Sequence, residues 1–336
     1  MNNKPLLALA AVLPFLLAAT DGSACVPGVL AELAPVASPQ EPGKKPAAPP
    51  KFDMNVLKAF FGSEPPAPKS DNKVTDEKAA LGRLLYHEKL SKTGDAACST
   101  CHDLTNHGIN ANAPVEGQRE ALSTVNAYRQ FAQFWDGRAA TVEDAVHGLA
   151  DDADLVGKIK GKPELVEAFG KAFGDGDTVT AANAKLAIGA FARKLAVKTA
   201  FDEFLDGKNS ALTTPQKIGL KTFIDVGCTA CHTTRLMGGQ MYQKLGVTAA
   251  YPSKDEGRFE VTKSEADKKM FKVTSLINVA KTAPYMHDGA VKTLPEIVAL
   301  MAKIQLNRTL KDDEVASIVA FLEALNGELP EGLAVK

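Results

Sequence analysis

One short pattern, Cys-x-x-Cys-His, constrains this chain more than any other feature and occurs twice, at residues 98–102 and 228–232. Two thiols at this spacing can form thioethers with the two vinyl groups of one haem, and the adjacent histidine then lies under the iron as its proximal ligand. We therefore predict two covalently bound haem c groups. The predicted haem contacts are Cys98, Cys101, His102, Cys228, Cys231 and His232.

Two other uses of paired cysteines agree less well with this chain. A four-cysteine zinc site needs two pairs separated by about 15–20 residues, whereas these pairs lie in different halves of the sequence. A thioredoxin-like redox site needs a βαβ pattern, which the sequence does not show. Haem attachment is therefore the interpretation we keep for both motifs.

The composition is that of a folded protein. Of the 336 residues, 45% are apolar and 24% are charged, which supplies a core and excludes a disordered chain or a small disulfide scaffold. The length favours two domains. The net charge of −1 gives no reason to expect a nucleic acid as a partner.

The first residues predict export. The apolar run at 5–19 is too short for a membrane span and fits a signal peptide, so we assign 1–24 to a signal peptide and expect a periplasmic protein. Cys25 follows Gly-Ser-Ala, which resembles a lipoprotein cleavage site, and lipidation there would anchor the protein to a membrane. Ordinary cleavage after Ala24 is the alternative, and the sequence leaves both open.

The rest of the chain predicts helices. Residues 25–69 are rich in proline, and we expect an extended tether there. Beyond it, apolar residues recur at helical spacing without sustained period-two alternation. We predict a mainly α protein of two cytochrome c-like haem domains packed face to face, with few short strands. These domains are expected at 70–205 and 206–330, one for each motif.

The role of each haem depends on its sixth iron ligand, because a firmly held methionine or histidine gives an electron-transfer haem and an open position allows chemistry. Histidines other than the proximal pair are His87, His107, His147 and His287. The methionine candidates in the second half are Met237, Met241, Met270, Met286 and Met301. Spacing alone does not choose among these residues.

Longer segments around the motifs resemble bacterial di-haem cytochrome c peroxidases and their relatives of the MauG type. The similarity runs over roughly 74–330. Its most specific segments are LGRLLY at 81–86, QFWDGRA at 133–139, FKV at 271–273, TAPYMHDG at 282–289 and MAKIQLN at 301–307. The resemblance implies two haem c groups and the reduction of hydrogen peroxide.

The resemblance also implies a division of labour between the two haems. Electrons would enter at the haem on His232, with Met301 as its sixth ligand, because thioether ligation favours reduced iron. Met286 is the second candidate for that position. The haem on His102 would react with peroxide. Trp135 would lie between the haems and carry electrons, and the alternative role for this residue is that of a buried structural side chain.

Peroxide reduction needs a group that moves a proton between the two oxygens, and a carboxylate can do this. The family uses a glutamine and then a glutamate after the tryptophan, and alignment by residue type places Asp144 and Asp154 at these positions. The Asn-Pro pair that usually precedes the glutamate is missing here. Asp154 is the predicted proton-transfer group, and Asp151 is the alternative. The remaining interpretation is that these acidic residues form a solvated loop without a catalytic role.

The loop after the first motif departs from the family. Many members hold a displaceable histidine on the peroxide haem, just ahead of a Gly-Gln pair, whereas no histidine lies close ahead of Gly117-Gln118. We expect this haem to be open or capped by water at rest, so that no reductive activation is needed. Ligation by His107 is the alternative.

The family also places a calcium ion between the domains, held by two backbone carbonyls and an asparagine side chain. The carbonyls correspond to Thr282 and Pro284, and Glu120 stands nearest to the asparagine. Because a carboxylate is a good ligand for calcium, we expect the site to persist.

The predicted function is that of an oxidoreductase, a cytochrome c peroxidase that reduces H2O2 to water. Its donor would be a small exported cytochrome c or cupredoxin, bound weakly and transiently as redox partners are. One alternative is a MauG-like enzyme that oxidises a protein side chain, although such proteins carry tyrosine in place of Met301. The other is a non-enzymatic di-haem electron carrier. A homodimer is compatible with the sequence, which does not determine the oligomeric state.

Overall fold

The computed structural model describes residues 48–109, 119–146 and 151–333. The chain divides into two units, 1–44 and 45–336, and every described residue belongs to the second. The predicted signal peptide, Cys25, the Gly117-Gln118 pair and His147 lie outside the described residues. In the part that is described, no helix is long and apolar enough to cross a membrane.

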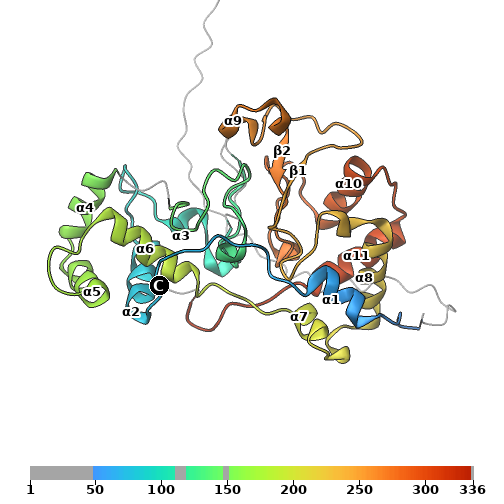
Figure 1. Ribbon diagram of the computed structural model, residues 1–336, viewed down its shortest axis with the longest axis horizontal. Helices are drawn as coiled ribbons and strands as arrows, with labels where there is room; N and C mark the ends of the chain where they lie inside the picture. Colours follow the sequence, from blue (N-terminus) through green and yellow to red (C-terminus); the bar gives the residue numbers. More distant parts are fainter. Residues whose placement is uncertain (1–47, 110–118, 147–150, 334–336) are drawn as a thin grey trace, which may run out of the picture. The chain divides into compact units, whose positions relative to one another are not determined.

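Helices dominate the described structure, which confirms the mainly α prediction (Figure 1). From residue 76 to the second motif, the helices are α2 (Asp76–His87), α3 (Cys98–Cys101), α4 (Asp152–Lys160), α5 (Pro163–Phe173), α6 (Ala181–Ala192), α7 (Ala200–Leu205) and α8 (Thr214–Val226). Later helices are α9 (Phe259–Thr262), α10 (Leu294–Leu306) and α11 (Asp312–Glu323). Within the described ranges, the strands are β1 (Tyr242–Lys244) and β2 (Met270–Lys272), which pair antiparallel with Gln243 opposite Phe271.

An additional helix, α1 (Met54–Phe61), lies inside the segment 25–69 that was predicted to be a tether. Its Leu57 and Phe61 are buried, and the Phe61 ring meets that of Phe201 edge-on at 5.3 Å. Apolar side chains at i and i+4 share one face of a helix, and here that face joins the core. The segment 25–69 is therefore not an extended tether throughout.

Threonine side chains begin several of the helices, because a hydroxyl can accept a hydrogen bond from an amide of the first turn. The Thr75 hydroxyl accepts a hydrogen bond from the Lys78 amide at the start of α2. Capping boxes begin α8, with Thr213 and Gln216, and α10, with Thr293 and Glu296. Each of these two helices carries a proline in its first turn, where no amide donor is needed.

The same close helix crossing occurs before each motif. Helix α2 meets α6 at Gly82, where an added Cβ would lie 2.0 Å from the Ala187 carbonyl oxygen. Helix α8 meets α11 at Gly219, where an added Cβ would lie 1.8 Å from the Ser317 carbonyl oxygen. Only glycine permits such an approach of two backbones. The two halves therefore share an architecture that their sequences repeat only weakly.

A buried asparagine in the left-handed conformation recurs after each motif. Asn126 has φ +58° and Asn278 has φ +62°. The side-chain oxygen of Asn126 accepts a hydrogen bond from the Val197 amide at 3.3 Å, and that of Asn278 accepts one from the Gly327 amide at 2.7 Å. Each asparagine thus ties its loop to the segment that follows the last helix of its half.

A tight hairpin follows each of these asparagines at the same interval. Gln133 pairs with Ala139 in one, and Tyr285 pairs with Val291 in the other. An Asp-Gly pair turns both hairpins, with the glycine at positive φ. Trp135 and His287 consequently occupy equivalent positions, immediately before the Asp-Gly pair.

Apolar side chains form two main cores. The first is enclosed by α2, α4, α5 and α6, and includes Leu81, Leu85, Ile159, Leu165 and Phe169. The second is enclosed by α1, α7, α8 and α11, and includes Phe61, Phe201, Leu220, Phe223 and Phe321. Helix α7 packs in the second core, although the boundary predicted at residue 205 assigns it to the first domain.

Candidate active site

The second Cys-x-x-Cys-His motif begins where α8 ends. Gly227 takes a left-handed conformation (φ +104°) that closes the helix, and a 3₁₀ turn at Cys228–Ala230 follows at once. The His232 ring donates a hydrogen bond from Nδ1 to the Met237 carbonyl oxygen at 2.8 Å. This bond leaves Nε2 with its lone pair free to bind a metal, which is the usual arrangement of a ligating histidine.

Burial keeps His232 and the Cys228 thiol uncharged. The pKa of His232 is lowered by burial, so the imidazole stays neutral and able to bind a metal. Burial raises the pKa of the Cys228 thiol to about 12. A buried thiol that stays protonated is a poor redox nucleophile. This observation disfavours a thioredoxin-like use of the cysteine pair.

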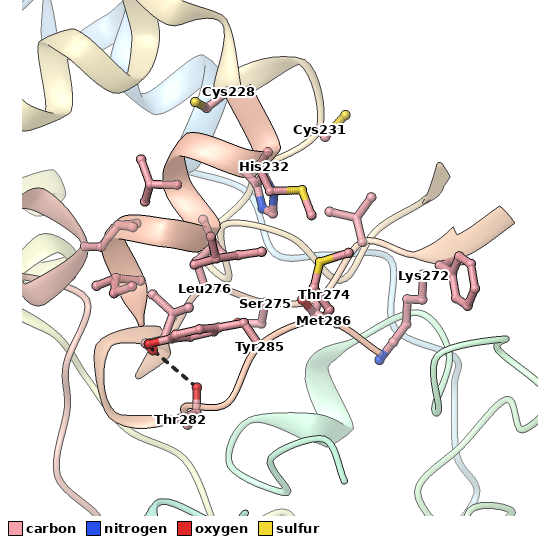
Figure 2. A pocket seen from close by; sticks show the side chains of 18 of the residues that line it. Cys228, Cys231, His232, Lys272, Thr274, Ser275, Leu276, Thr282, Tyr285 and Met286 are labelled. Atoms are coloured by element: carbon pink, nitrogen blue, oxygen red, sulfur yellow. Dashed lines mark hydrogen bonds between the residues drawn. The ribbon is translucent and has the colours of Figure 1, made fainter. Parts of the chain in front are cut away.

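A mainly apolar cavity opens beside this motif. It is lined by Cys228, Cys231 and His232, and by the two candidate ligands Met286 and Met301. Figure 2 shows His232 and Met286 along the same cavity. Met301 comes from α10 and is half-buried, whereas Met286 is buried in its hairpin with φ +75°. Two thiols, an imidazole and a thioether around an apolar space form a donor set that fits haem c.

The first motif forms the short helix α3 and the histidine that follows it. The Nδ1 atom of His102 lies 3.3 Å from the Gly108 carbonyl oxygen, as in the second motif. The Tyr86 hydroxyl donates to the His102 carbonyl oxygen at 2.6 Å and so links α2 to the motif. Burial raises the pKa of the Cys98 thiol to about 11. The donor set again fits haem c.

The sixth position of the first haem stays a prediction. Residues 110–118, which contain the Gly117-Gln118 pair, lie outside the described residues. His107, the alternative ligand, is half-buried in a left-handed conformation, and its carbonyl oxygen accepts a hydrogen bond from the Ser123 hydroxyl at 2.6 Å. This bond fixes the backbone of His107 and leaves its ligand role untested.

Trp135 is half-buried and lines the same cavity as His232. Its indole Nε1 donates to the Glu120 carbonyl oxygen at 2.8 Å, and its own carbonyl oxygen accepts from the Lys272 amide at 2.7 Å. The indole ring meets the ring of His287 edge-on, with centroids 6.3 Å apart. The hydrogen bond and the ring contact therefore hold the indole in one orientation.

Glu120 joins this cavity with an unusual side chain. Only 7% of the residue is exposed, and its Oε2 atom has no hydrogen-bond partner. Burial raises the pKa of Glu120 to about 7, and the positive charge of Lys292 opposes that rise. Thr282 and Pro284 line the same cavity. The three residues of the predicted calcium site thus line one cavity, and a buried carboxylate oxygen without a partner fits a cation ligand. The site itself stays a prediction.

The predicted proton-transfer residues lie at the surface. Asp154 is exposed in the first turn of α4, where it pairs with Lys158 at 2.9 Å and its amide donates to Asp151. Asp144 is exposed, and its carboxylate accepts from the amide and the hydroxyl of Thr141. The neighbouring residues 147–150 lie outside the described residues. No described contact joins these carboxylates to the first motif, and their roles stay predictions.

Two charged residues were not predicted, Lys272 in the cavity and Arg119 next to Glu120 in the chain. Lys272 is buried, its ammonium donates to the Gln130 side-chain oxygen at 2.6 Å, and burial lowers its pKa to about 7. Arg119 binds Asp255 through two nitrogens, at 2.6 and 2.7 Å, and also pairs with Asp136. The apolar neighbours of Lys272 in the sequence were the one local sign of its burial. Nothing near Arg119 in the sequence indicates its distant partners.

Comparison with known proteins gives consistent matches. A family model described as di-haem cytochrome c peroxidase matches residues 76–210. The chain is 38% identical to cytochrome c551 peroxidase of Pseudomonas aeruginosa, over 76% of this chain and 81% of that protein. It is 37% identical to cytochrome c551 peroxidase of Nitrosomonas europaea, over 75% of this chain and 81% of that protein.

A solved structure matches the fold. It is that of a MauG-like protein associated with microbial copper homeostasis, with a TM-score of 0.70 and 24% sequence identity. The match covers 81% of this chain and 95% of that one. At this level of identity, the likeness concerns the fold alone.

Proposed function

This chain belongs to the di-haem cytochrome c peroxidase family, and from that premise we propose that electrons enter beside His232 and reach the peroxide site beside His102 through Trp135. The overall reaction takes two electrons and two protons to convert one H2O2 into two waters. The observation that carries the proposal is that Trp135, His232 and Met301 line one cavity. Haem c, when attached to the two motifs, supplies the redox-active iron.

The residues around this cavity have distinct tasks in the proposal. The Met237 carbonyl fixes the His232 ring through Nδ1 and directs Nε2 toward the cavity. Met301 offers a thioether, which favours the reduced state of a bound iron. The carbonyl of Glu120 holds the Trp135 indole in place. A rigid indole needs little rearrangement when it loses and regains an electron.

The donor in this proposal is a small exported cytochrome c or cupredoxin, and the protein acts in the periplasm. Support comes from the signal-peptide pattern at 1–24 and from the names of the relatives, which are cytochrome peroxidases. Lipidation of Cys25 would add a membrane anchor.

The deciding experiment compares peroxide consumption by the haem-loaded protein in two states, fully oxidised and half-reduced, with a reduced small cytochrome c as donor. We expect fast, donor-coupled turnover from both states, because the first haem is predicted to be open. Turnover only after half-reduction would place a displaceable ligand such as His107 on that haem. A spectral change with peroxide but without donor oxidation would contradict the proposed electron path.

Asp154 is the proposed proton-transfer group at the peroxide site. We expect Asp154→Asn to slow the reaction of the first haem with peroxide by at least about 100-fold, since positioned acid–base groups contribute roughly 10²–10⁴-fold. Stopped-flow spectroscopy of the haem band measures this rate. The matched control is Asp152→Asn, an exposed acid in the same first turn of α4. Equal rates in both variants would make Asp154 a surface residue without a role in catalysis.

Calcium is proposed to bind the Glu120 carboxylate together with the carbonyl oxygens of Thr282 and Pro284. The affinity of such a site depends on ligand charge, so Glu120→Gln should weaken calcium binding by at least about tenfold, or about 1.4 kcal/mol. Calorimetric titration of calcium into chelator-treated, haem-loaded protein measures the loss. Glu256→Gln, which alters a half-exposed glutamate paired with Lys269, should change nothing. Equal affinities in both variants would refute this site.

A further inference from the structure

Tyr251 lies in the loop between β1 and α9. Its hydroxyl donates hydrogen bonds to both carboxylate oxygens of Asp288, at 3.1 and 3.0 Å. Asp288 is exposed and Tyr251 is half-buried, so the pair stands at the protein surface. The peroxidase reaction described above assigns no task to this pair.

An unbroken series of ring contacts connects Tyr251 to Trp135. The Tyr251 ring meets that of His287 edge-on, with centroids 5.9 Å apart, and His287 meets Trp135 in the same way at 6.3 Å. Edge-to-face contacts of this kind are the favoured geometry of aromatic pairs. Direct contact between rings gives an electron short tunnelling steps from the surface to the indole.

His287, the central ring of the series, is held firmly. It is buried, its Nε2 lies 2.8 Å from the Ser253 hydroxyl, and the Phe271 ring stacks on it at 4.6 Å. His287 holds the position in the second hairpin that Trp135 holds in the first. The contact between the two rings therefore joins equivalent points of the two hairpins. The aspartates that follow Trp135 and His287 in the two hairpins have different partners. Asp136 is buried and paired with Arg119, whereas Asp288 accepts a hydrogen bond from Tyr251.

The carboxylate of Asp288 is placed to take a proton. Burial and the nearby negative charge raise the pKa of Tyr251 above its ordinary value, so the phenol stays protonated until it is oxidised. A phenol that loses an electron becomes strongly acidic and must release its proton. A base within hydrogen-bond distance accepts that proton in the same step.

We propose that Tyr251 is a redox-active tyrosine that carries an oxidising equivalent from Trp135 to the protein surface, where a small phenolic reductant removes it. The inference rests on the proposed role of Trp135, and peroxide is the oxidant. In the first step, one electron passes from Tyr251 through His287 to oxidised Trp135, and the phenolic proton moves to Asp288. In the second, a phenol gives a hydrogen atom to the Tyr251 radical, and Asp288 releases its proton to water.

Tyr242 provides the matched comparison. It is also half-buried, but its hydroxyl accepts a hydrogen bond from Arg258 at 2.7 Å and its ring lies under that guanidinium. A neighbouring positive charge opposes oxidation, and no described carboxylate takes its proton. Tyr242 should therefore remain reduced.

The test is electron paramagnetic resonance of the haem-loaded protein, frozen within seconds after peroxide is added without a donor. We expect a neutral tyrosyl radical that falls at least tenfold in Tyr251→Phe and persists in Tyr242→Phe. The phenylalanine at 251 keeps the ring contact with His287 and removes only the hydroxyl. Asp288→Asn should also reduce the signal, because an amide is a far weaker base than a carboxylate.

A second measurement identifies the site independently. In the presence of peroxide and a small phenol such as 2-methoxyphenol, a further peroxide turnover oxidises Tyr251 again, and its radical combines with the phenoxyl radical left by the earlier hydrogen-atom transfer. The coupled ring regains aromaticity by releasing its C–H proton, and peptide mass spectrometry detects the adduct at Tyr251. A tyrosyl signal unchanged in Tyr251→Phe, or coupling at Tyr242 instead, would overturn the proposal. Absence of any tyrosyl signal in the unaltered protein would also overturn it. Oxidation of a small cytochrome c donor, measured on the same samples, shows separately whether the proposed peroxidase path operates.

Discussion

Replacing Met301 by histidine is expected to lower the midpoint potential of the haem on His232 by a few tenths of a volt, a large part of the roughly 0.8 V range that axial ligands span. A thioether favours reduced iron, whereas a second imidazole donates more strongly and favours the oxidised state. Electron transfer from a high-potential donor then becomes unfavourable, and donor-coupled turnover should nearly stop. Spectroelectrochemical titration measures the potential.

Met286 supplies the control for this experiment, because it lines the same cavity. Met286→Leu conserves side-chain volume and should leave the potential of the haem nearly unchanged. The reverse pattern, a large shift in Met286→Leu and none in Met301→His, would assign the ligand role to Met286. Haem content, determined on both variants, separates a ligand effect from a loss of the cofactor.

The second large effect is expected for Trp135→Phe. Phenylalanine is much harder to oxidise than tryptophan, so donor-coupled turnover should fall about 100-fold, equivalent to about 2.7 kcal/mol of activation free energy. Two rates are measured by stopped flow: reduction of the haem on His232 by the donor, and its reoxidation after peroxide is added. Only the second rate should fall.

The variant also loses the hydrogen bond from the indole to the Glu120 carbonyl, which costs about 1 kcal/mol of stability. Thermal unfolding of the haem-loaded variant measures that structural loss on its own. Turnover that matches the unaltered protein would make Trp135 a packing residue. A fall in both stopped-flow rates would indicate a general disturbance of the cavity.

Helix α1 and helix α7 show where sequence patterns were insufficient for the fold. The proline-rich composition around α1 predicted an extended segment, yet Leu57 and Phe61 bury one face of a short helix. Helix α7 lies before the predicted boundary and packs beyond it. In both cases the outcome depended on which distant side chains were free to cover an apolar face, and composition does not contain that information.

In the candidate site, too, sequence patterns were insufficient to place individual residues. Asp154 was placed by alignment with a family pattern, and the structure finds it exposed and paired with Lys158. Glu120 was matched only as the residue nearest to the family's asparagine, and the structure finds it buried, with an unpaired oxygen, in the cavity that Thr282 and Pro284 also line. Spacing in the sequence does not say which carboxylate faces a cavity, because burial is set by segments from elsewhere in the chain.

What the sequence by itself determined is the chemistry that operates over a few residues. The spacing of two thiols and a histidine specifies haem attachment because those atoms bond to one cofactor, and threonine and proline begin helices because they satisfy or lack nearby amides. The tertiary structure alone decided the equivalence of the two hairpins, the contact of Trp135 with His287, and the burial of Lys272. Each of these joins residues far apart in the chain, and only the folded packing determines which of them meet.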